Sequence, residues 1–121
     1  MIDVDEFQTG AREWLAAQGS EEMLRVAPAG EGVGHNSLND LELTEWAFKE
    51  ALRMIPPVPS MPRRALRSFE YGGYTIPAGA MVGINIHMVH HMEEYWPDPE
   101  SFDPMRFTPD KVKARHKYAW V

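Results

Sequence analysis

The sequence contains no cysteine, which excludes disulfides, thiolate metal sites and a cysteine nucleophile within these 121 residues. Long apolar runs are also missing. The longest, near residues 78–86, is interrupted by a glycine and an asparagine and falls far short of the ~20 residues that a membrane-spanning helix needs. No dense basic block is present, so we expect no nucleic acid as a partner. The first residues are acidic and carry no export signal, so we expect a cytoplasmic protein without a membrane segment.

What is present is the composition of one globular domain, with 44% apolar and 25% charged residues. The formal net charge of −6 is unevenly distributed, since residues 1–50 have a balance of −8 and residues 51–121 a balance of +2. A basic run near the end of the sequence has two interpretations, a solvated terminus or a docking surface for an acidic protein. The run consists of Lys111, Lys113, Arg115, His116 and Lys117.

The first part of the chain has the spacing of a helix. Apolar residues recur at helical intervals over residues 5–18, and we expect Gly19-Ser20 to interrupt this helix before a further turn over residues 21–26. Residues 28–36 contain three glycines and indicate a loop.

A second and stronger helix is expected from residue 39 or 40 to residue 55. It has a broad apolar surface, and Pro56-Pro57 must end it because proline has no N–H donor and restricts the residue before it. Its candidate N-caps are Ser37, Asn39 and Asp40.

The remaining sequence alternates like β-structure. After an extended segment over residues 58–62, residues 69–71 and 74–76 flank Gly72-Gly73 and predict a hairpin, and residues 82–86 predict a third strand. A short helix is expected over residues 90–95. Prolines then exclude long regular structure, at positions 97, 99, 104 and 109. The predicted class is therefore α+β: two helices, a small antiparallel sheet, a short helix and a proline-rich meander.

Three charged residues attract attention. Glu50 and Arg53 stand at i and i+3 on the main helix, where their side chains can meet. On a solvated surface such a pair contributes only a few tenths of a kcal/mol. If a second arginine approaches, the shared carboxylate can be buried and still compensated. Arg106, in an apolar and proline-framed segment, is the candidate.

These residues fall within a wider pattern. Lys49-Glu50-Ala51-Leu52-Arg53 followed by Pro56-Pro57 resembles the E-x-x-R helix of the cytochromes P-450, the haem-thiolate monooxygenases. The segment from Phe102 to Phe107 resembles that family's F-x-P-x-R-F motif. Three further segments lie between these two motifs, in the order in which the family has them: Arg63-x-Ala65, Ile76-Pro77-Ala78-Gly79 and, directly before the second motif, Trp96-Pro97-Asp98-Pro99.

The resemblance divides residues 1–121, as part of a cytochrome P-450 domain, into four stretches. They are a loosely matched helix and loop (1–37), the E-x-x-R helix (38–55), a small β-sheet (58–86), and a short helix with the meander (87–121).

The resemblance also implies roles. Glu50, Arg53 and Arg106 would form a buried structural network that supports the haem-binding region without making bonds itself. Arg63 would pair with a haem propionate, with its neighbour Arg64 as the fallback. The substrate pocket would be lined by Val58, Pro59, Ser60 and Met61.

In the family, a cysteine in a glycine-rich loop ligates the haem iron shortly after a segment like Tyr118–Val121, and this sequence does not include it. We therefore expect an internal fragment of a P-450, inactive alone. The parent enzyme would insert an oxygen atom from O₂ into an apolar small molecule. It would use haem and an electron donor of the ferredoxin type.

An alternative from another class is a small non-catalytic binding module. His87, His91 and Glu94 would converge on a divalent metal if they shared one helix. The metalloprotease order H-E-x-x-H is missing, and a strand-to-helix junction between His87 and His90 would break the required geometry. We therefore expect no native metal site.

Overall fold

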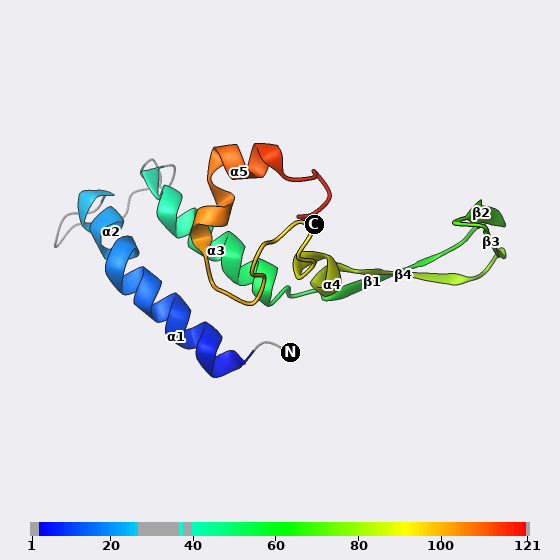
Figure 1. The fold of residues 1–121 in the computed structure, drawn as a ribbon, viewed down its shortest axis with the longest axis horizontal. Helices are drawn as coiled ribbons and strands as arrows, with labels where there is room; N and C mark the ends of the chain where they lie inside the picture. The colour runs from blue at the N-terminus through cyan, green and yellow to red at the C-terminus, as the bar shows by residue number, and fades with distance from the viewer. Residues whose placement is uncertain (1–2, 27–36, 38–39, 121) are drawn as a thin grey trace.

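The computed structural model describes residues 3–26, 37 and 40–120. A group of helices forms its larger part, and a long two-stranded ribbon projects from it and ends in a small hairpin (Figure 1). The predicted α+β class is confirmed, with helices and small antiparallel sheets.

The N-terminal helix is not interrupted. Helix α1 (Val4–Trp14) continues through a π-helical turn, η1 (Leu15–Gly19), into α2 (Ser20–Val26). The expected break at Gly19-Ser20 is wrong because the wider π-turn keeps both ends helical. Gly19 is buried there, and a Cβ atom at this position would meet Leu15 Cδ2 at 3.2 Å.

Helix α3 (Glu42–Met54) is the E-x-x-R helix. It ends at Met54, one residue before the predicted end, and its C-cap Ile55 directly precedes the two prolines. The prediction of its N-cap is wrong: Leu41 occupies that position and its side chain makes no capping bond. Asn39 and the predicted loop over residues 28–36 lie outside the described residues.

The β-structure consists of two separate two-stranded sheets. Strand β1 (Ser60–Arg64) pairs antiparallel with β4 (Met81–Asn85), with Met61 opposite Ile84. Between them in sequence, β2 (Phe69–Tyr71) and β3 (Tyr74–Ile76) form the hairpin at the tip of this ribbon. The hairpin is as predicted, and its two glycines have φ of 58° and 80°, which side-chain-bearing residues rarely adopt.

The short helix lies earlier than expected. Helix α4 (Ile86–His90) begins directly after β4 because the Asn85 side chain caps it, with Oδ1 accepting from the N–H of Met88 at 2.9 Å. The prediction of a helix over residues 90–95 is therefore wrong, and Ile86 is helical rather than the last residue of a strand.

The meander follows Trp96 and contains only two short elements, the 3₁₀-helix η3 (Pro104–Phe107) and α5 (Pro109–Ala114). Each begins with a proline, which suits the first turn of a helix. The expected absence of long regular structure here is confirmed within the part of the chain that the structure describes.

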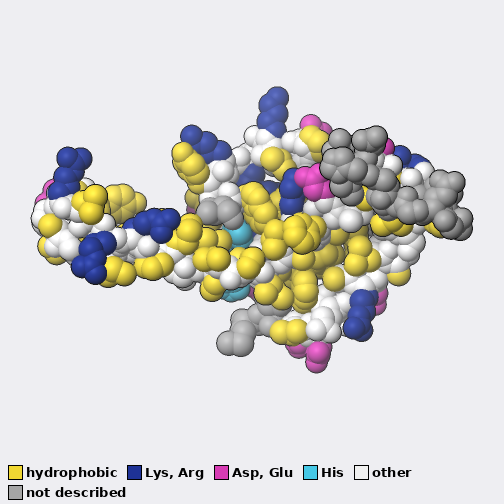
Figure 2. Space-filling model, turned by 180° about the vertical axis from the view of Figure 1, so that it is seen from behind, with side chains coloured by type: hydrophobic (Ala, Val, Ile, Leu, Met, Phe, Trp, Pro, Cys, Tyr) yellow, Lys and Arg dark blue, Asp and Glu magenta, His cyan; other side chains and the backbone are white. Residues whose placement is uncertain are grey.

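The core brings the meander against α3. Trp96, Phe107 and Ala119 are buried together, and Trp46, Tyr95 and Trp120 pack around them. By contrast, every residue of β4 is exposed, including Val82 and Ile84, and Figure 2 shows hydrophobic side chains at the surface of the projecting ribbon beside Lys and Arg. Among the described residues, no helix has the length and apolar character that crossing a membrane requires.

Candidate functional site

The carboxylate of Glu50 is the centre of the candidate site. Its Oε2 accepts from Nε of Arg53 at 2.7 Å, and its Oε1 accepts from Nη2 of the same residue at 2.9 Å. Both side chains are completely buried, at 0% exposure. The i, i+3 spacing on α3 therefore produces a two-point ion pair inside the protein and not a solvated surface pair.

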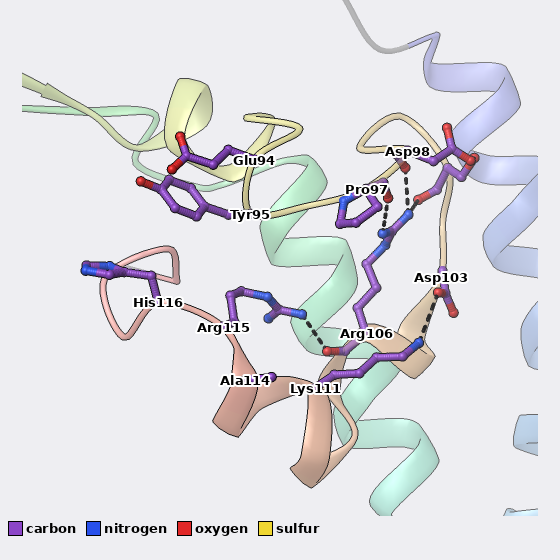
Figure 3. Close-up of a pocket in the computed structure, with 11 residues that line it drawn as sticks. Glu94, Tyr95, Pro97, Asp98, Asp103, Arg106, Lys111, Ala114, Arg115 and His116 are labelled. Carbon is purple, nitrogen blue, oxygen red and sulfur yellow. Dashed lines mark hydrogen bonds and ion pairs between the residues drawn. The ribbon is translucent and has the colours of Figure 1, made fainter.

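Arg106, from η3, approaches the same carboxylate from a segment that is distant in sequence. Its Nε lies 3.3 Å from Glu50 Oε1, which also accepts from the backbone N–H of Asp103 at 3.0 Å. The two remaining nitrogens of Arg106 donate to the backbone carbonyls of Pro97 and Asp98 (Figure 3). The structure thus brings together the three residues that the sequence singled out.

Arg53 extends these contacts to a third element. Its Nη1 donates to the carbonyl of His90, the last residue of α4, at 2.9 Å. One buried carboxylate and two guanidinium groups therefore join α3, α4 and the meander. Burying these charges is tolerable only because each has partners, since an unpaired buried charge costs several kcal/mol.

Glu22 is a buried acid that sequence reasoning missed. It lies on α2, and its carboxylate accepts from the N–H of Leu43 at 2.6 Å, and from the N–H and hydroxyl of Thr44 at 2.8 and 2.7 Å. These are the unpaired donors at the start of α3, so Glu22 supplies the cap that Leu41 lacks. The signal in the sequence is weak, because a cap from another helix has no fixed spacing.

We expect Glu22→Gln to destabilise the fold near neutral pH by about 1–2 kcal/mol, through loss of a carboxylate at a helix N-terminus. Burial alone raises the pKa of Glu22, but hydrogen bonds from Thr44 and Leu43 and the charge of Arg25 lower it overall. The stabilisation by the Glu22 carboxylate is therefore fully present above the ordinary pKa of 4.5. It is lost as the pH falls through the lowered pKa of the folded state. Denaturant unfolding at neutral and acidic pH measures this loss. The exposed neighbour Glu21 is the control, and equal effects from Glu21→Gln would contradict the capping role.

The basic residues of β1 are at its exposed end. Arg63 Nη1 donates to the carbonyl of Pro62 at 3.0 Å, and Nη2 lies 3.7 Å from the sulfur of Met61. Among the ion pairs of the described residues, none involves Arg63 or Arg64. Both guanidinium groups therefore remain accessible to an anion from outside this chain.

The four expected pocket residues lie in different surroundings. Val58 borders a 240 Å³ space together with Pro57, Ile86 and Trp120. Pro59 makes a backbone contact, its carbonyl accepting from the N–H of His87 at 3.1 Å. Ser60 and Met61 belong to the projecting strand β1.

The alternative metal site receives no support. The rings of His87 and His91 are 4.2 Å apart, but Nδ1 of His91 bonds the backbone carbonyl of His87 at 2.8 Å. Within the described part of the chain, no group of three His, Cys, Asp or Glu residues has the geometry to hold a metal ion. Glu94 instead borders a separate cavity, so the three residues of this alternative do not come together as a site in the described part of the chain.

That second cavity, of 780 Å³, lies beside the buried network (Figure 3). Its wall carries charges of both signs, including Arg106 and Arg115 as well as Asp98 and Asp103. Arg115 is half-buried there, so it is not part of a solvated terminus, whereas the other residues of the basic run are exposed.

The chain is similar to known proteins over most of its length. A family model described as Cytochrome P450 matches residues 15–121. Cytochrome P450 4c21 of Blattella germanica is 42% identical over 84 residues, which are 69% of this chain and 17% of that protein. Taurochenodeoxycholic 6 alpha-hydroxylase of Sus scrofa is 36% identical over 102 residues, 84% of this chain and 20% of that protein.

Solved structures agree with this. Retinoic acid-bound cyanobacterial CYP120A1 matches with a TM-score of 0.83 and 28% identity, over 95% of this chain and 26% of that one. The heme domain of cytochrome P450DA matches with a TM-score of 0.82 and 25% identity, over 92% of this chain and 26% of that one. The chain thus spans about a fifth of the length of the curated relatives it matches. Its sequence, its fold and its buried Glu50–Arg53–Arg106 contacts lead to one conclusion: the chain belongs to the cytochrome P450 family.

Proposed function

We propose that this chain is part of a haem monooxygenase that inserts an oxygen atom from O₂ into an apolar small molecule. The observation that carries the proposal is the Glu50–Arg53–Arg106 network, because it links the E-x-x-R helix to the meander through a fully buried carboxylate. Family membership supports it. Alone, the chain supplies scaffold and pocket wall and is inactive.

The network acts by positioning. Glu50 receives three kinds of donor, from its own helix, from Arg106 and from the backbone of Asp103. Arg106 in turn fixes two meander carbonyls. The meander is thereby held against α3 at a defined distance, and no proton or electron transfer is assigned to these three residues.

The residues present fit one part of a haem group. Arg63 has an exposed, forked guanidinium without an acidic partner among the described residues, which suits a propionate. Bound haem would supply oxygen activation, which in this family depends on a cysteine thiolate at the iron. The 121 residues contain no cysteine, so that ligand would come from a segment outside them.

An apolar substrate is consistent with the wall that this chain offers. Val58, Pro57 and Ile86 border the 240 Å³ cavity and carry no charge. Among the relatives, one is named as a hydroxylase and one structure is bound to retinoic acid, an apolar carboxylic acid. Pro59, Ser60 and Met61 would join this wall once the rest of a P450 domain surrounds β1.

The electron donor of this proposal is an acidic, ferredoxin-type protein. Helix α5 and the residues after it expose Lys111, Lys113 and Lys117, and a surface of this sign attracts an acidic partner at long range. A cytoplasmic location is part of the same proposal.

The test uses a completed domain, in which residues 1–121 replace the matching quarter of the cyanobacterial relative. We expect this completed domain, when reduced and exposed to CO, to give the red-shifted Soret band of thiolate-ligated haem. The 121-residue chain given haem should not, since histidines are its only strong iron ligands. A thiolate-type band from the chain alone would contradict the assignment, and so would a completed domain that holds haem without that band.

A further inference from the structure

Arg115 lies directly after α5 and contacts Trp96, which precedes the meander, and residues within the meander. Its guanidinium carbon is 3.7 Å from the centroid of the Trp96 ring and 5.5 Å from that of Phe107. Its Nη2 donates to the backbone carbonyl of Arg106 at 2.7 Å, a bond visible in Figure 3. Arg115 thus holds the backbone of the residue whose side chain reaches Glu50.

Trp96 connects Arg115 to the same network. The indole is completely buried, and the guanidinium carbon of Arg53 lies 5.4 Å from its centroid. The guanidinium groups of two arginines therefore lie over the same ring. A cation over an indole is stabilised most when both are withdrawn from water. Arg115 and Arg53 therefore both contact the Trp96 ring, and Arg115 is also bonded to the backbone of Arg106.

The residues that follow Arg115 return to the core. The N–H of Ala119 donates to the carbonyl of His116 at 2.9 Å, and Ala119 itself is only 1% exposed. The ring of Trp120 then stacks on that of His90, with centroids 4.9 Å apart and an interplanar angle of 12°. The backbone of Arg115 is extended, so this residue is where the chain leaves α5 and turns toward α4.

The position favours arginine over other cations. No ion pair among the described residues includes Arg115, so its charge is met by a ring face and a carbonyl. A planar guanidinium can lie on an indole and donate in its own plane at the same time, whereas a lysine ammonium cannot do both.

We infer that Arg115 is a positioning residue: by binding Trp96 and the carbonyl of Arg106, it fixes residues 116–120 relative to the Glu50–Arg53–Arg106 network. This inference rests on the proposed function for its consequence. In a haem-loaded P450 domain, residues 116–120 would lead to the segment that carries the iron ligand, and Arg115 would set the direction in which the chain enters it.

The first test measures hydrogen exchange in the 121-residue chain. Arg115→Ala removes the stacking and the hydrogen bond, so exchange of the Ala119 amide should rise about 5- to 30-fold. Amides in the middle of α3 should change less than about twofold, because local opening does not require global unfolding. Equal acceleration in both places, or no change at Ala119, would overturn the inference.

The second test uses the completed domain and its CO spectrum. Two Soret bands are compared in the CO complex: the red-shifted band of thiolate-ligated haem and the band at shorter wavelength from haem without that ligand. We expect Arg115→Ala to lower the ratio of the first to the second about 5- to 30-fold among molecules that retain haem. Arg115→Lys should restore less than half of the loss, and Lys113→Ala, on the exposed side of α5, should have no effect. An unchanged ratio in Arg115→Ala, or full rescue by lysine, would contradict the role assigned to the planar guanidinium. If the completed domain without substitutions lacks the thiolate band, the proposed function fails. The hydrogen-exchange rate of the Ala119 amide would still show whether Arg115 fixes residues 116–120.

Discussion

Glu50→Gln in the completed domain is expected to destabilise the folded state by about 3–5 kcal/mol. The substitution keeps the shape of the side chain but removes the carboxylate that Arg53 and Arg106 share. Two guanidinium groups would then lie in the interior without a countercharge, Arg53 at 0% side-chain exposure and Arg106 at 9%. Denaturant unfolding measures the loss, and haem content should fall with it.

Glu45→Gln is the matched control, since Glu45 lies on the same helix and pairs with Lys49, but with a side chain that is 59% exposed. Its substitution should cost less than about 1 kcal/mol. The double variant Glu50→Gln with Arg106→Leu should lose much less than the sum of the two single variants, because the second change removes a charge that the first left unpaired. Costs that simply add would show that the two residues do not belong to one network.

The elements that sequence reasoning predicted are those with local causes. The hairpin over residues 69–76 follows from two adjacent glycines between β-forming runs, and the end of α3 follows from Pro56-Pro57. The errors arose where a local signal had a less common outcome. The sequence predicts a helix break at Gly19, but a π-turn accommodates this glycine, and the Asn85 cap starts α4 at Ile86, four residues earlier than predicted.

The candidate site divides in the same way. The i, i+3 spacing of Glu50 and Arg53 is enough to predict that their side chains meet. Arg106 can be predicted to join them because it is a charged residue in an apolar, proline-framed segment. Glu22, by contrast, caps a helix whose first residue lies 20 positions later in the chain, and no periodicity encodes such a contact. Arg115 was grouped with exposed lysines because composition does not show which member of a basic run meets a buried ring.

The completed domain is also expected to lose stability in acid through His90. This histidine is 1% exposed, and burial lowers its pKa from 6.5 to about 4. A hydrogen bond with the backbone of Arg53 opposes this shift, and the charges of Arg53, His91 and His87 add to it. An unfolded histidine binds its proton near pH 6.5, whereas the folded one stays neutral. Above pH 6.5, His90 is neutral in both states and does not reduce the free energy of unfolding. As the pH drops from 6.5 toward about 4, the free energy of unfolding decreases by about 3 kcal/mol through this residue.

His90→Phe isolates this effect because a phenyl ring can still stack on Trp120. We expect the variant to be less stable than the unsubstituted domain at about pH 7.5, and the gap to shrink by about 3 kcal/mol at about pH 4.5. His116→Phe, at an exposed position close to Tyr95, is the control for introducing a phenyl ring in place of an imidazole. A gap for His90→Phe that is the same at both pH values would mean that the folded protein protonates His90 as readily as the unfolded chain does. In that case the ring would not be held neutral between Trp96 and Trp120, and the packing of residues 116–120 against α4 would have to be assigned differently.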